Sequence, residues 1–203
     1  MPERFGGQLV EDCAEREQED RSMLGAEQER WVRGQLSDSR ARWKVIGQQM
    51  LMAQLEQKQG EGEPWWSDGW DGYPAGRQRI LSQIAEQQIE NVMVIGGDIH
   101  SFWVSDLKQD FRDPNSPTVA TEFVGTSVTS EGVPYDAFNR FLPENPHIKF
   151  FESRERGYVL VDLASELWRT DLRVVDTITQ PEATVRTIGS YVVEQGRAGA
   201  QPA

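Results

Sequence analysis

Residues 91–101 read Asn91-Val92-Met93-Val94-Ile95-Gly96-Gly97-Asp98-Ile99-His100-Ser101. The four apolar residues 92–95 have no polar break and end at two glycines, a pattern typical of a strand buried on both faces of a sheet. Asp98 and His100 follow two positions apart, so in an extended segment their side chains project to the same side. Open α/β sheets bind ligands at the carboxyl ends of their strands, where a carboxylate and an imidazole can share one metal ion. The alternative is an Asp in a turn beside an incidental His.

The length and charge of the chain limit its class. A chain of 203 residues fits one domain with one sizeable core. The net charge of -12 argues against nucleic acid as a partner and against docking on anionic lipid. Cys13 is the single cysteine, so an internal disulfide is excluded. The sequence contains no apolar run long enough to cross a membrane and no visible signal peptide, and we expect no membrane partner.

The first half of the chain has the pattern of a βαβ unit. An apolar stripe at helical spacing predicts a helix from Leu24 through Leu36, with Trp31 as its core anchor. Residues 43–52 are a strand candidate, and residues 64–74 form a loop rich in Trp, Gly and Pro. A second helix is predicted to begin at Pro74 and to bury Ile80, Leu81, Ile84 and Ala85. It leads into the strand at residues 92–95.

The second half is rich in strand patterns. Residues 119–128 predict one strand, and residues 148–151, 157–163 and 167–178 predict three more that form an antiparallel meander. A turn at Ser165-Glu166 joins the last two strands into a hairpin. Residues 1–23 are mostly polar and predict a flexible arm, and residues 191–203 predict a disordered tail.

Seven short segments in the same order resemble the carboxyl-terminal half of the PhoD-like alkaline phosphatases, members of the calcineurin-like metallophosphoesterase superfamily. They are Leu24-Gly25 with Gln28 and Trp31, residues 42–50, 70–74, 97–101 and 122–130, and then residues 145–150 and 156–162. The resemblance implies an α/β fold, in which a layered metallophosphoesterase-like sheet with flanking helices is present only in part and ends in an antiparallel meander. Residues 24–190 would be the carboxyl-terminal part of that domain.

The resemblance also implies an activity. The family hydrolyses phosphate monoesters or diesters with metal ions, described as iron and calcium, and its members are often exported. Two such cations clamp the phosphoryl oxygens of a small phosphoester and lower the pKa of a bound water. By resemblance, Asp98 and His100 are metal ligands. Asp71, Thr126 and Ser127 are candidates to line the site, although Asp71 before Gly72 also suits a turn cap and the two hydroxyls also suit a structural role.

The sequence departs from the family pattern in its missing amino-terminal half. The early Gly-Asp and Asp-Asp-His-Glu-like motifs do not occur here, and Cys13 lies in the wrong context to replace the cysteine of one branch. His147, in Asn-Pro-His-Ile-Lys-Phe, suits capping or packing better than ligation. Two ligands from one loop are too few for a binuclear centre. Two interpretations follow: a truncated phosphatase that needs a missing amino-terminal half, or a catalytically silent remnant or partner-binding module of the same fold.

Overall fold

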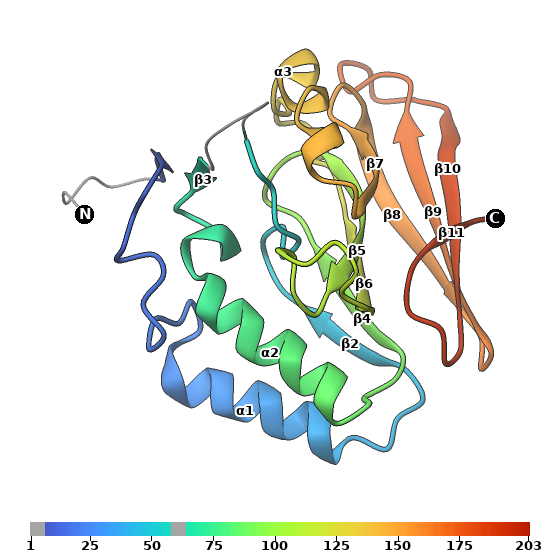
Figure 1. The fold of residues 1–203 in the computed structure, drawn as a ribbon. Helices are drawn as coiled ribbons and strands as arrows, with labels where there is room; N and C mark the ends of the chain where they lie inside the picture. The colour runs from blue at the N-terminus through green and yellow to red at the C-terminus, as the bar shows by residue number, and fades with distance from the viewer. Residues whose placement is uncertain (1–6, 58–63) are drawn as a thin grey trace.

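The computed structural model describes residues 7–57 and 64–203, and these residues form three layers: two helices, a central sheet and a second sheet (Figure 1). The helices, which lie side by side, are α1 (Gly25–Asp38) and α2 (Pro74–Glu86). The central sheet has the spatial order β2 (Lys44–Gly47), β4 (Val92–Gly96), β6 (Thr118–Val124), β5 (Phe102–Lys108) and β7 (Ile148–Glu152). The second sheet contains β8 (Arg156–Leu163), β9 (Leu167–Val175), β10 (Val185–Glu194) and β11 (Gln201–Pro202). The predicted α/β class is confirmed.

Strand β4 is central, as the apolar run at residues 92–95 predicts. It pairs in parallel with β2 on one side and with β6 on the other. Val92 and Val94 belong to the core between the helices and the sheet, whereas Met93 belongs to the core between the two sheets. Because successive side chains of a strand point to opposite faces, a strand covered on both faces needs apolar residues at every position.

The two helices cover one face of the central sheet. Pro74 occupies the first turn of α2, and Ile80, Leu81 and Ile84 are buried, as predicted. In α1, Leu36 is buried, but the side chain of Trp31 is 61% exposed. The prediction that Trp31 anchors this helix in the core was therefore wrong, because no described element covers that side of α1.

The antiparallel meander is confirmed, with a different first strand. It consists of β8, β9 and β10, each paired antiparallel with the next. The predicted first strand, β7, instead pairs with β5 in the central sheet, where Trp103 lies opposite Phe151. The side chains of β7 contact both cores, Phe151 on the helix side and Phe150 on the other. A strand covered on both faces belongs in the middle layer.

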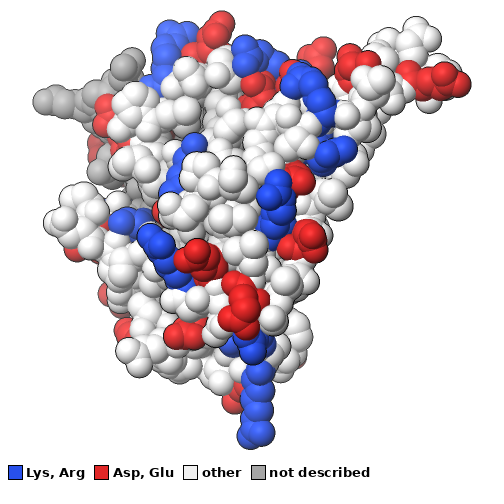
Figure 2. Space-filling model, turned by 90° about the vertical axis from the view of Figure 1, so that its right-hand side faces the viewer, with Lys and Arg blue, Asp and Glu red and all other residues white. Residues whose placement is uncertain are grey.

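The outer face of the second sheet carries charges of both signs. Figure 2 views the molecule from this side and shows Lys and Arg interspersed with Asp and Glu among uncharged residues. Arg169 and Asp171 form an ion pair at 3.1 Å, and Ser190 donates to Asp171 at 2.7 Å. Among the described residues, no helix is long and apolar enough to cross a membrane.

The predicted flexible arm is packed against the body over its described part; residues 1–6 lie outside the described residues. Strand β1 (Leu9–Val10) pairs with β3 (Trp65–Trp66). The buried guanidinium of Arg16 lies 4.4 Å from the ring centroid of Trp65 and donates to the Asp71 carbonyl. Arg21 stacks on Tyr73 and donates to the Gly72 carbonyl at 2.9 Å. The aromatic loop at residues 64–73 thus binds two arginines of this polar segment.

The predicted disordered tail at residues 191–203 is also ordered. Its first residues complete β10, and β11 returns to pair with the same strand. Gly199 adopts a φ of +106°, a conformation that side chains disfavour, and its N–H donates to Thr121 Oγ1 at 2.9 Å. The Ala200 side chain is buried, and Lys149 donates to the Ala200 carbonyl at 2.6 Å. Small residues allow this tight return, so here a composition typical of disorder serves close packing.

Candidate functional site

The chain turns sharply at the carboxyl end of β4. Ile99 N–H donates to the Gly97 carbonyl at 2.8 Å, and Asp98 between them has a φ of +67°. This i→i+2 bond around a positive φ defines the rare and strained form of the γ-turn. His100 also has a positive φ, +55°. Such conformations cost about 1–3 kcal/mol each and concentrate at functional sites.

Asp98 and His100 line the same cavity, which has a volume of about 560 Å³. The premise of an extended segment was wrong, because residues 97–101 are a turn and not a continuation of the strand. The γ-turn nevertheless brings both residues to one space. The cavity is also bordered by segments from residues 50–57, 66–71 and 131–138. It therefore lies at the sheet edge where open α/β folds bind ligands.

The ring of His100 is held in one tautomer. Its Nδ1 lies 3.0 Å from the Glu131 carbonyl oxygen. Because a carbonyl oxygen only accepts hydrogen bonds, this contact requires a proton on Nδ1, and in the neutral imidazole the lone pair is then on Nε2. Metal-ligating histidines are commonly oriented by such a bond from the second ring nitrogen to a backbone carbonyl. His100 thus has the tautomer that metal ligation through Nε2 needs.

The main chain of His100 is fixed by side chains from the second sheet and from the loop after β6. Its carbonyl accepts from Thr126 Oγ1 at 3.1 Å and from Arg156 at 3.3 Å. Gly132 packs so closely that a Cβ there would lie 2.7 Å from the same oxygen. Thr126 therefore supports the cavity from behind and is not among its lining residues. Ser127, the other hydroxyl candidate, donates to the Ser130 carbonyl in a local turn.

Asp71 lies in the wall of the cavity, but its carboxylate is engaged within the protein. One oxygen accepts from Arg77 at 2.7 Å, and the other accepts from the Leu55 N–H at 2.9 Å. Asp71 and Arg77 are both buried. The carboxylate thus closes a buried ion pair and tethers the wall segment at residues 50–57, a role that differs from the turn cap considered for it.

A second tether of the wall is Glu122, which sequence reasoning did not single out. Its carboxylate, fully buried in β6, accepts from Met52 N–H at 2.6 Å and from Ala53 N–H at 2.8 Å. Burial raises the pKa of Glu122 to about 7, although the two N–H groups act to lower it. The available signal was an acidic residue in the middle of the strand pattern Val119–Val124.

His147 packs within the fold, as the sequence predicts. Its Nε2 lies 2.7 Å from the Gln54 carbonyl oxygen, to which it must donate, and its ring meets Phe111 edge-on at 4.7 Å. Burial lowers the pKa of His147 to about 4, so the imidazole is neutral at pH 7. His147 thereby supports the same wall segment that Asp71 and Glu122 hold.

The described residues offer few potential metal ligands. Within residues 7–57 and 64–203, no group of three or more His, Cys, Asp or Glu side chains is close enough to hold a metal ion. The described lining of the cavity also contains no Lys or Arg. Asp98 and His100 can contribute an oxygen and a nitrogen to a cation, and a complete coordination shell requires further donors.

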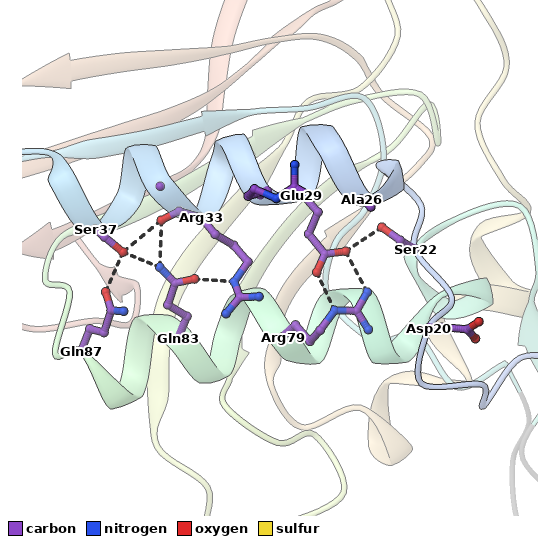
Figure 3. Close-up of a pocket in the computed structure, with 11 residues that line it drawn as sticks. Asp20, Ser22, Ala26, Glu29, Arg33, Ser37, Arg79, Gln83 and Gln87 are labelled. Atoms are coloured by element: carbon purple, nitrogen blue, oxygen red, sulfur yellow. Dashed lines mark hydrogen bonds and ion pairs between the residues drawn. The ribbon is translucent and has the colours of Figure 1, made fainter.

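A separate cavity of about 540 Å³ lies between α1 and α2 (Figure 3). Its polar side chains bond to one another. Glu29 accepts from Arg79 at 2.8 Å, and this bond lowers the pKa of Glu29. Gln83 donates to the Arg33 carbonyl at 2.8 Å and to Ser37 at 2.6 Å. These contacts join the two helices, and we assign this cavity no catalytic role.

Comparisons with known proteins identify relatives of this chain. A family model described as PhoD-like phosphatase matches residues 5–172. The chain is 38% identical over 182 residues to alkaline phosphatase D of Bacillus subtilis (strain 168), an alignment that covers 88% of this chain and 31% of that protein. A solved structure of PhoD superposes with a TM-score of 0.87 at 36% identity and covers 97% of this chain and 38% of the other. The chain therefore spans about a third of the length of these relatives.

Proposed function

The chain belongs to the PhoD-like phosphatase family, and on this premise we propose that the cavity at the end of β4 is part of the site of a metal-dependent phosphoester hydrolase. The observation that carries the proposal is that Asp98 and His100 line one cavity and that the Nδ1 contact of His100 places the lone pair of the neutral imidazole on Nε2. A carboxylate oxygen and a neutral imidazole nitrogen suit iron, and the carboxylate also suits calcium. The donor types therefore fit the ions that the family is described with.

Each site residue has a distinct part in this proposal. Bound cations would neutralise the phosphoryl oxygens and lower the pKa of a water. Asp98 would hold a cation through its carboxylate, and His100 would hold it through Nε2 while its Nδ1–H bonds to Glu131. The γ-turn and the bonds to the His100 carbonyl keep both donors in place. Preorganised donors of this kind cost no rearrangement when substrate binds.

The rest of the cavity favours a small phosphoester with an organic group. Its apolar wall includes Leu51, Leu55, Ile99 and Phe138. The ring of Trp103 packs edge-on against the ring of Phe138, with 6.4 Å between the two ring centroids. Since the described lining has no cationic side chain, the phosphate charge would be balanced by metal, and the organic part of the ester would lie against the apolar wall.

The remaining metal ligands would come from the part of the longer relatives that lies outside the region aligned with this chain. Two donors are fewer than the three or more that a stable ion requires. The second candidate function, a catalytically silent module that binds a partner, is favoured by the same shortage of donors among the described residues. The two candidates differ in what happens when the missing part is supplied.

The test is coexpression of this chain with the unmatched amino-terminal portion of Bacillus subtilis alkaline phosphatase D. Iron and calcium are added, and hydrolysis of bis-p-nitrophenyl phosphate is measured together with metal content after gel filtration. The chain alone should hydrolyse the ester little faster than buffer. The pair should retain metal and turn over substrate, and Asp98→Ala should abolish both. Asp162→Ala, in an exposed position of β8, is the matched control. A complex that forms but holds no metal and has no activity supports the silent module.

A further inference from the structure

The cavity that contains Asp98 and His100 has an exposed aromatic side chain in its lining. Trp66 of β3 and Leu9 of β1 are directly opposite in the antiparallel β1–β3 ribbon, and both line the cavity. Residues opposite each other in such a pair project to the same face. Trp66 is 41% exposed and Leu9 is 54% exposed, and neither belongs to the two apolar cores of the described residues. The ribbon therefore offers apolar surface to a ligand in the cavity.

The indole of Trp66 is held in place by the ribbon. A Cβ on Gly7 would lie 2.5 Å from Cε2 and Cζ2 of the ring, so the main chain packs on the indole as closely as only glycine allows. The ribbon is closed by Ser67 N–H, which donates to the Gln8 carbonyl at 3.0 Å, and by Gln8 N–H, which donates to Ser67 Oγ at 3.1 Å. A ring that is ordered before the ligand arrives lowers the entropic cost of binding.

The rest of the lining limits the kind of organic group that fits beside Trp66. Apolar side chains are the majority of the described lining, and Leu55 and Phe138 are among them. Asp68 and Glu131 also border the cavity, whereas its described lining contains no Lys or Arg. An anionic substituent on the organic group would meet charges of its own sign. The lining therefore favours an uncharged planar ring, which can stack on an indole.

We propose that Trp66, with Leu9 beside it, is the binding platform for the organic group of the phosphoester and selects esters of uncharged aromatic alcohols. The cavity of about 560 Å³ contains the platform together with Asp98 and His100, so a ring on Trp66 and a phosphoryl group near this pair can belong to one molecule. Trp66 determines specificity and does not contact the reacting atoms. That the ligand is a phosphoester rests on the proposed function, whereas binding of the ring needs no metal.

The experiment measures ring binding without catalysis. The full chain, labelled with nitrogen-15 and kept in EDTA, is titrated with 2-naphthol, the alcohol half of an aryl ester. Its indole N–H signals are followed by NMR, and affinities are measured by calorimetry. The signal that Trp66→Ala removes belongs to Trp66, and we expect it to shift saturably. Decahydro-2-naphthol has the same carbon skeleton without the planar ring and should bind about fivefold more weakly, because aromatic pairs gain affinity beyond their buried area.

The variants separate stacking from apolar contact. Trp66→Leu should abolish the preference for the planar alcohol, whereas Trp66→Phe should retain it. Trp31→Ala is the matched control, because Trp31 is 61% exposed and does not line the cavity, and it should leave both affinities unchanged within about twofold. Circular dichroism verifies that each variant is folded.

Three results would overturn the proposal: no shift of the Trp66 signal, equal affinities of the wild type for the two alcohols, or an equal loss of affinity in Trp66→Leu and Trp31→Ala. The outcome is separable from that of the proposed reaction. Ring binding in EDTA together with no hydrolysis in the coexpression test would support the platform and refute the reaction. Hydrolysis without ring binding would support the reaction and refute the platform.

Discussion

Replacing Glu122 by Gln should remove a specific pH dependence of stability. In the wild type, burial raises the pKa of Glu122 from 4.5 to about 7, so the folded state binds this proton more tightly than the unfolded state. The stability that comes from this proton is fully present below pH 4.5 and is lost as the pH rises through 7. The amide side chain of the Glu122→Gln variant has no such proton to lose. The difference in unfolding free energy between wild type and variant should therefore change with pH.

The size of this pH-dependent change in unfolding free energy follows from the raised pKa of Glu122. Each pH unit between the two pKa values changes the unfolding free energy by about 1.4 kcal/mol. Between pH 5.5 and pH 8.5, the wild type should lose about 2 kcal/mol relative to Glu122→Gln. At all pH values the variant also loses one acceptor for the N–H groups of Met52 and Ala53, a constant penalty of about 1–3 kcal/mol. The pH-dependent part is separable from this constant.

The assay is urea unfolding followed by tryptophan fluorescence, at pH values from 5.5 to 8.5. Glu86→Gln, an exposed carboxylate at the end of α2, controls for the loss of a charge. A wild-type-minus-variant difference that stays flat would refute the raised pKa. A difference that grows in favour of the wild type as the pH rises would show that the two backbone N–H groups outweigh burial.

Three further outcomes test individual contacts of Asp71, Thr126 and Arg16. Asp71→Asn should destabilise the protein by about 3–5 kcal/mol in urea unfolding, because it leaves the buried charge of Arg77 without its counter-ion. Thr126→Val should lower the unfolding free energy by about 1–3 kcal/mol, since its hydroxyl donates to the His100 and Glu155 carbonyls; Ser127→Ala, in an exposed turn, should stay within about 0.5 kcal/mol of wild type. Arg16→Ala should accelerate limited proteolysis within residues 7–23, and an unchanged cleavage rate would contradict the anchoring of this segment on the aromatic loop.

Local patterns predicted the elements whose environment is uniform along their length. Strand β4 follows from an uninterrupted apolar run, α2 follows from Pro74 and a buried stripe, and β8–β9 follows from alternation around a turn. The pairing of β7 was not predictable, because alternation does not tell which sheet a strand joins. The exposure of Trp31 depends on what covers α1, and a helical stripe carries no information about its neighbours.

The candidate site also has features that the local sequence predicts and features that depend on tertiary contacts. The sequence by itself determined that a carboxylate and an imidazole follow a buried strand, because composition and order set the end of β4. Only the tertiary structure decided how they are used. The bonds of Thr126 and Arg156 to the His100 carbonyl, the carbonyl of Glu131 that sets the His100 tautomer, and the burial of Glu122 all depend on segments distant in the sequence. Turn geometry, tautomer and pKa are set by the atoms around a residue, and folding alone brings those atoms together.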